Sequence, residues 1–175
     1  MDNHLFCIDN FMYMEKATKE TLWKQFGASI DMLENAILFC PEELWDKREF
    51  WYKAYHCLFY LDYYLTLEPK KFSPPSPYTL SEFDPMGAMP DRVYSKEELL
   101  WYLQYGRKKC HDLLLTITDE IANSRWVNEY MDYSLLEILL YNMRHVQHHA
   151  AQLNLLLREA IADAPKWISQ TEQNL

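Results

Sequence analysis

Glycine is scarce in this sequence, and a basic cluster and long apolar runs are missing. Three glycines among 175 residues are too few for a turn-rich β fold, so we expect helices. Acidic side chains outnumber basic ones by 26 to 17 without any basic run, and such a chain is a poor partner for a phosphate backbone. We therefore expect no nucleic-acid binding, and no membrane span because no apolar stretch is long enough.

Paired cysteines are also missing. Cys7, Cys40, Cys57 and Cys110 lie singly along the chain, without a C-x-x-C pair. This pattern predicts reduced, buried and inert thiols and not a disulfide framework. The N-terminus shows neither a basic segment followed by an apolar one nor a lipidation motif. We expect a cytoplasmic protein with a single domain over residues 1–175, a length sufficient for a full core.

Apolar residues recur with helical spacing in four segments, and proline or polar residues separate them. Between the second and third segments, residues 69–94 contain six of the eight prolines. Ser95-Lys-Glu-Glu98 is a capping box that starts the third helix. The predicted fold class is all-α, a four-helix bundle with a long proline-rich crossover between helices 2 and 3. The expected helices cover residues 22–40, 48–67, 95–121 and 133–162.

The crossover is long for a compact domain, and such loops often cover or bind a ligand. Its aromatic side chains, Phe72, Tyr78 and Phe83, could cover a pocket or pack on the helices. We expect packing.

Three of the six histidines fall within five residues of the last predicted helix. At about 100° per residue, His145 and His149 share a half-buried row of the helix, whereas His148 lies on its polar face. Two imidazoles one turn apart can bind the same metal ion. Without a further ligand they would be ordinary helix histidines bonded to their neighbours.

The further ligand can come from the second helix. His56 lies in its middle among aromatic residues, and in a bundle it would face the histidine pair. Asp62 is the alternative, which would give a site of two histidines and one carboxylate. Asn142 and Gln152 share the row of the histidine pair, and together with Asp62 they are the expected hydrogen-bond partners of the ligands.

His56 in an aromatic helix, followed far downstream by His145-x-x-x-His149-x-x-Gln152, resembles the DinB-like (YfiT-like) family of metal-binding bundles. The resemblance covers most of the chain, including the helix order and the long crossover. It implies that the three histidines bind one divalent metal ion, with zinc or nickel the expected metals for imidazole ligands. The family commonly has Arg-Gly-Gln after its last ligand, whereas Ala-Ala-Gln stands here, so that arginine has no counterpart at this place.

A metal ion held by three histidines keeps an open position, as catalytic sites do. The resemblance implies a thiol S-transferase in which a metal-bound thiolate attacks an electrophilic small molecule. The alternative enzyme is a hydrolase with metal-bound water, whose base would have to be Asp62, Glu82 or Asp84. No other catalytic residue is assigned. A ferritin-like di-iron site does not fit, because no histidine follows a glutamate by three positions.

A third interpretation is a non-enzymatic, dimeric bundle that binds a metal or a small ligand. The chain has six tryptophans, which cannot all be central in a bundle of this size. Exposed tryptophan favours an interface, so a homodimer is expected.

Overall fold

A computed structural model describes residues 14–175, and Cys7 therefore lies outside the described residues. The fold is all-α apart from one short hairpin, as expected from the glycine content. None of the helices in residues 14–175 is long and apolar enough to cross a membrane. The helices are α1 (Lys16–Phe39), α2 (Glu42–Trp45), α3 (Phe50–Tyr64), α4 (Lys96–Thr116), α5 (Asp119–Asn123) and α6 (Leu135–Ile161).

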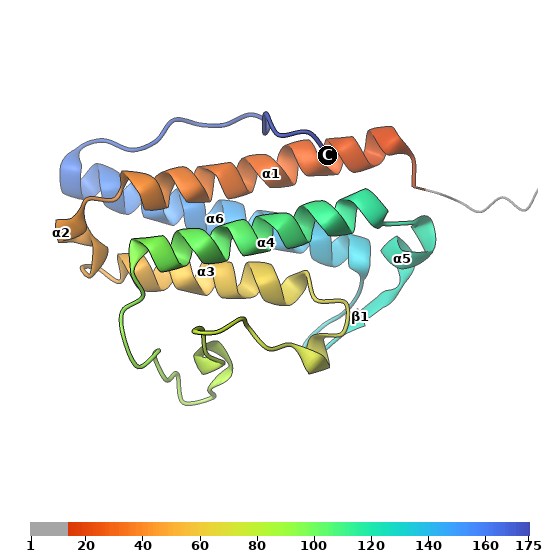
Figure 1. The fold of residues 1–175 in the computed structure, drawn as a ribbon, viewed down its shortest axis with the longest axis horizontal. Helices are drawn as coiled ribbons and strands as arrows, with labels where there is room; N and C mark the ends of the chain where they lie inside the picture. The colour runs from red at the N-terminus through yellow and green to blue at the C-terminus, as the bar shows by residue number, and fades with distance from the viewer. Residues whose placement is uncertain (1–13) are drawn as a thin grey trace, which may run out of the picture.

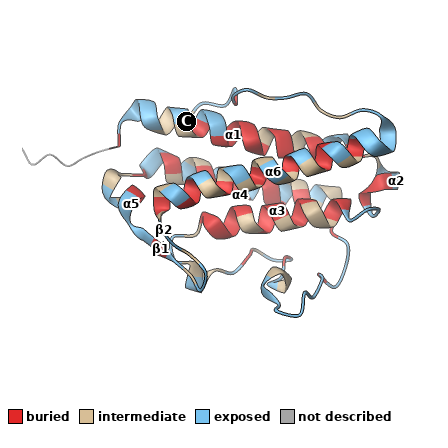
Figure 2. Ribbon diagram, turned by 180° about the vertical axis from the view of Figure 1, so that it is seen from behind, coloured by how far each residue is buried: buried red, intermediate tan, exposed pale blue. Residues whose placement is uncertain are grey.

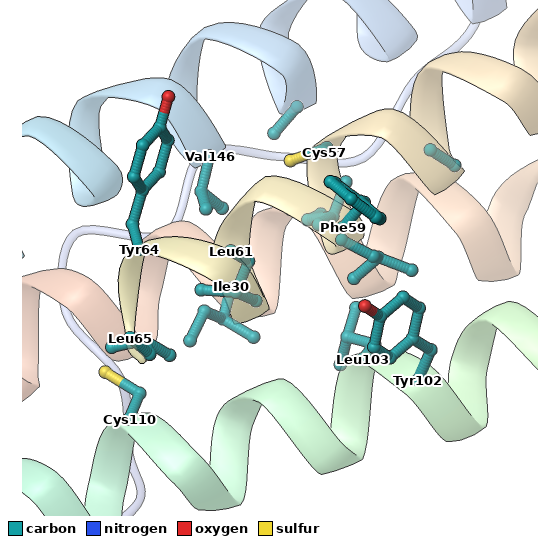
Figure 3. Close-up of a cluster of buried hydrophobic side chains, with 14 of the residues drawn as sticks. Ile30, Cys57, Phe59, Leu61, Tyr64, Leu65, Tyr102, Leu103, Cys110 and Val146 are labelled. Atoms are coloured by element: carbon teal, nitrogen blue, oxygen red, sulfur yellow. The ribbon is translucent and has the colours of Figure 1, made fainter. Parts of the chain in front are cut away.

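The four long helices lie side by side in Figure 1. α1 packs against α4 and α6, and α3 packs against the same two helices. Buried residues follow their facing sides in Figure 2. Ile30, Leu61, Leu103 and Val146, one from each long helix, are fully buried in the cluster of Figure 3. One core between these four helices therefore holds them together.

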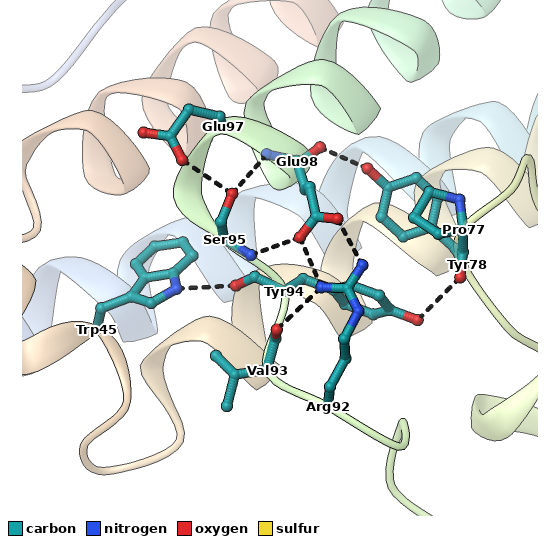
Figure 4. A network of polar contacts seen from close by, with 9 residues as sticks. All are labelled: Trp45, Pro77, Tyr78, Arg92, Val93, Tyr94, Ser95, Glu97 and Glu98. Carbon is teal, nitrogen blue, oxygen red and sulfur yellow. Dashed lines mark hydrogen bonds and ion pairs between the residues drawn. The ribbon is translucent and has the colours of Figure 1, made fainter.

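Capping boxes start two of the long helices. At the start of α4, the Ser95 hydroxyl accepts a hydrogen bond from the Glu98 backbone N–H, and the Glu98 carboxylate accepts one from Ser95 N–H, as predicted. Arg92 also donates to Glu98, and Figure 4 shows how the network joins the end of the crossover to α4. Ser134 and Glu137 form the same box at α6, which the sequence analysis did not identify.

The region between α4 and α6 differs from the prediction. The third helix was expected to continue to Ile121, but α4 ends at Thr116, and Thr118 caps the separate helix α5. The polar break that follows is a hairpin, in which β1 (Arg125–Val127) pairs with β2 (Asp132–Ser134). Trp126 anchors this hairpin, because its buried indole donates to the Thr66 carbonyl. The tertiary packing of Trp126 thus outweighs the local sequence, whose polar residues alone predict only a break between two helices.

The crossover contains two short 3₁₀ turns, η1 (Pro69–Lys71) and η2 (Ser81–Phe83). Its aromatic side chains pack on the helices, as expected. Phe72 and Phe83 both lie against Phe59 of α3, at ring-centroid distances of 5.2 and 4.9 Å. Tyr78 stacks on Tyr102 of α4 at 4.1 Å. These contacts hold the crossover against α3 and α4.

The cysteines of the described residues are free and buried, as predicted. Burial raises the pKa of each thiol, to about 12 for Cys40 and further for Cys57 and Cys110. Such thiols stay protonated and unreactive at neutral pH. Four of the tryptophans are buried, whereas Trp101 and Trp167 are 52% and 69% exposed.

Asp62 lies in the contact between α3 and α4 and not beside the histidines. Its carboxylate is 1% exposed and accepts hydrogen bonds from Lys109 Nζ at 2.6 Å and from the Tyr102 hydroxyl at 3.0 Å. Six residues separate Asp62 from His56, which turns the two side chains about 120° apart around the helix. Asp62 is therefore neither a ligand nor a ligand partner in this arrangement, contrary to the sequence-based expectation.

Replacement of Lys109 tests this buried pair. Lys109→Met leaves the Asp62 carboxylate buried without its cation, and we expect a loss of about 3 kcal/mol in the free energy of unfolding. Lys108→Met is the matched control, because the Lys108–Asp112 pair is exposed and contributes about 0.5 kcal/mol or less. Urea unfolding of both variants measures the difference. Equal losses of stability in the two variants would contradict the role of Lys109 as the partner of the buried Asp62 carboxylate.

Candidate metal centre

Helices α3 and α6 bring together the three histidines that the sequence singled out. One ring nitrogen from each of His56, His145 and His149 lies within 4.8 Å of the other two. All three side chains are half-buried, and the His56 ring lies 4.8 Å from that of His149 and 5.5 Å from that of His145. The helical spacing of His145 and His149 places them on the face that packs against α3.

The geometry of the pair on α6 suits a cation. His145 Nε2 and His149 Nε2 are 3.1 Å apart. Ligand nitrogens about 2.0 to 2.1 Å from one metal ion are separated by about 3.0 to 3.4 Å in common geometries. The Nδ1 atoms of both rings are buried and have no hydrogen-bond partner among residues 14–175. These Nδ1 atoms lie on the opposite side of each ring from Nε2, so the fit to a divalent metal rests on the imidazole donors and on the approach of the Nε2 atoms.

Glu82 completes the surroundings of His56. Its carboxylate Oε2 lies 2.6 Å from His56 Nδ1, and the side chain is 4% exposed. Because a carboxylate accepts hydrogen bonds, Nδ1 carries the proton and Nε2 keeps its lone pair for a cation. A carboxylate on the far nitrogen of a ligand histidine is the usual way to orient the ring. From the sequence, Glu82 is expected only as a possible base, since nothing local relates a loop residue to His56.

The electrostatic surroundings keep the α6 histidines neutral. Burial, together with the nearby histidines, lowers the pKa of His145 to about 3 and that of His149 to about 4. The side chain of Gln152 opposes the shift in the pKa of His149. Neutral imidazole is the form that binds a metal, so protons compete weakly for these two nitrogens at neutral pH.

The other expected partners have different contacts. Asn142 is fully buried, and its amide donates to the Leu61 carbonyl of α3 at 3.0 Å. Gln152 Nε2 lies 3.1 Å from Nε2 of His148, which is exposed as predicted. Asn142 thus joins α6 to α3, and Gln152 lies between His148 and His149.

Tyrosines surround the three histidines. The Tyr60 ring lies 4.8 Å from that of His56 and 5.6 Å from that of His145, and the Tyr64 ring lies 6.0 Å from that of His145. Burial raises the pKa of Tyr60 to about 12, so its phenol stays protonated at neutral pH. The site therefore has largely apolar walls, with phenol groups as hydrogen-bond donors.

Comparison with known proteins adds no relative. No protein-family model, curated protein or solved structure matches the chain. The geometry of the three histidines is therefore the feature of this chain that points to a function.

Removal of the Glu82 charge tests its role at His56. Glu82→Gln replaces the carboxylate that orients the ring by a neutral and weaker acceptor, and we expect the zinc affinity to fall by about 10- to 100-fold. Asp91→Asn, an exposed carboxylate of the same crossover, is the control and should keep the wild-type affinity. Competition with a chromophoric chelator measures both. An unchanged affinity for Glu82→Gln would contradict the assigned role.

The low pKa values of the α6 histidines predict how stability depends on pH without metal. Below pH 6.5 the unfolded chain takes up protons that the folded site excludes, so the free energy of unfolding falls as pH decreases. At pH 5 the loss relative to pH 7 should be about 2 kcal/mol for each histidine. Urea unfolding in a chelator at pH 7 and pH 5 measures it.

The control for this pH dependence is a double variant. His145→Gln/His149→Gln should lose less stability between pH 7 and pH 5 than the wild type, whereas His148→Gln should behave like the wild type, since His148 is exposed. An identical pH dependence in wild type and double variant would show that other groups cause it.

Proposed function

We propose that this protein is a DinB-like four-helix bundle that binds one zinc or nickel ion through His56, His145 and His149. The observation that carries the proposal is the approach of three ring nitrogens from α3 and α6 to within 4.8 Å of one another. Four long helices packed side by side and the long crossover between α3 and α4 also support it.

We further propose a thiol S-transferase. A metal ion with three imidazole ligands keeps an open position and, when bound, lowers the pKa of a coordinated thiol. Side chains of the protein orient the ligands around this open coordination position. Glu82 orients His56, and the half-buried, neutral rings of His145 and His149 bring their Nε2 atoms to within 3.1 Å of each other. The tyrosine walls limit the access of water, which competes with a thiol for the metal.

The contacts of the three carboxylates that could act as a base favour thiol transfer over hydrolysis. A hydrolase needs a base beside the bound water. Asp62 is paired with Lys109, and Glu82 is bonded to Nδ1 of His56. Asp84 accepts a hydrogen bond from the backbone N–H of Met86 in an exposed turn. Asp62 and Asp84 are thus engaged elsewhere, and Glu82 already serves as the hydrogen-bond partner of His56.

Cobalt substitution tests the thiol proposal. We expect the visible d–d spectrum of the cobalt protein to change, and a sulfur-to-cobalt band to appear, when cysteine or 2-mercaptoethanol is added. Ethanolamine, which has no thiol, is the control ligand and should leave the sulfur band absent. A cobalt spectrum that no thiol alters at saturating concentration would contradict thiol transfer and favour a non-enzymatic metal-binding bundle.

A further inference from the structure

A second candidate site lies on the outer face of α6, beside the histidines. It is an open groove of about 640 Å³ between α1, α6 and the segment after α6. Gln25 and Ser29 line it from α1, Arg144 and His145 from α6, and Trp167 and Ile168 from the C-terminal segment. Its volume is in the range of small-molecule sites.

The C-terminal segment forms one wall of this groove, and contacts with α1 hold the segment in place. After α6 the chain turns back and runs beside α1, as Figure 1 shows. The Trp23 indole donates to the Gln173 carbonyl at 2.8 Å, and Thr171 is buried against Gly27. A Cβ atom on Gly27 would lie 2.5 Å from Thr171 Cγ2, so glycine permits this close approach. These contacts anchor the segment directly after Trp167 and Ile168.

The charge of the groove is opposite to that of the chain. The chain has 26 acidic and 17 basic residues, yet the lining contains the guanidinium of Arg144 and no carboxylate. Arg144 makes no hydrogen bond or ion pair with its side chain among the described residues. Four of the other five arginines pair with carboxylates, namely Arg48, Arg92, Arg107 and Arg125. The groove thus offers an arginine whose partner the described part of the chain does not provide.

Apolar surface lies next to this charge. Trp167 is 69% exposed at the wall, and Met143, Ala151 and Ile168 also line the groove. Exposed indole provides a flat surface for an aromatic or similarly flat ligand. A guanidinium recognises a carboxylate or another oxyanion with two parallel hydrogen bonds.

We propose that this groove binds a small organic anion with a flat apolar body, whose charged end pairs with Arg144 and whose body packs on Trp167. Neither residue belongs to the metal centre or to its partners, so the inference goes beyond the proposed function. His145 lines both the groove and the metal centre, which places the bound anion next to the histidines.

The test uses 1-naphthoate as the probe and 1-naphthalenemethanol as its neutral counterpart, titrated into the full chain and followed by NMR. We expect saturable binding of naphthoate, at least about tenfold tighter than that of the alcohol. Arg144→Gln should remove this preference, and Trp167→Ala should weaken both ligands. Arg158→Gln is the matched control, because Arg158 is an exposed arginine of α6 outside the groove, and it should bind like the wild type.

The titration is run in a chelator and again with zinc, so that its outcome does not depend on the metal centre. Binding in the chelator that requires Arg144 supports the groove even if no metal binds. Equal affinity for the acid and the alcohol, an unchanged affinity in Arg144→Gln, or no saturable binding of naphthoate would overturn the proposal. Circular dichroism confirms that each variant keeps its helices.

Discussion

The packing of α3 on α6 is the contact on which the rest of the site depends. Leu61 and Val146 are fully buried there, and the buried Asn142 amide donates to the Leu61 carbonyl. That bond fixes the position of α6 along α3, because a shift by one helical turn, about 5.4 Å, would break it. The same shift would separate His56 from the pair on α6. Core packing and the buried Asn142 amide thus determine whether the three imidazole rings lie close together.

The crossover and the C-terminal segment contribute side chains to the two sites that the long helices do not provide. Glu82 reaches His56 from the crossover, whose aromatic rings hold it against α3. The segment after α6 returns along α1 and adds Trp167 to the groove beside His145. Irregular segments thus supply the carboxylate beside His56 and the aromatic wall, while rigid helices supply the candidate metal ligands. This division matches the common placement of functional residues on loops held by a scaffold.

Local periodicity was sufficient to predict the long helices, the capping box at Ser95 and the shared row of His145 and His149, because each depends on residues a few positions apart. The same reasoning could not relate Glu82 to His56, since their contact depends on how the crossover folds back. It also misassigned Asp62, whose orientation depends on Lys109 of another helix. The hairpin was missed for the same reason, since contacts distant in the sequence decide each of these features.

The central claim is that His56, His145 and His149 bind one metal ion. Elemental analysis of the untagged protein tests it most directly, with His145→Ala/His149→Ala and His148→Ala analysed beside the wild type. We predict close to one equivalent of zinc or nickel in the wild type and in His148→Ala, and none in the double variant while its helices remain. Metal absent from the wild type after anaerobic reconstitution, or equal metal in the double variant, would contradict the account.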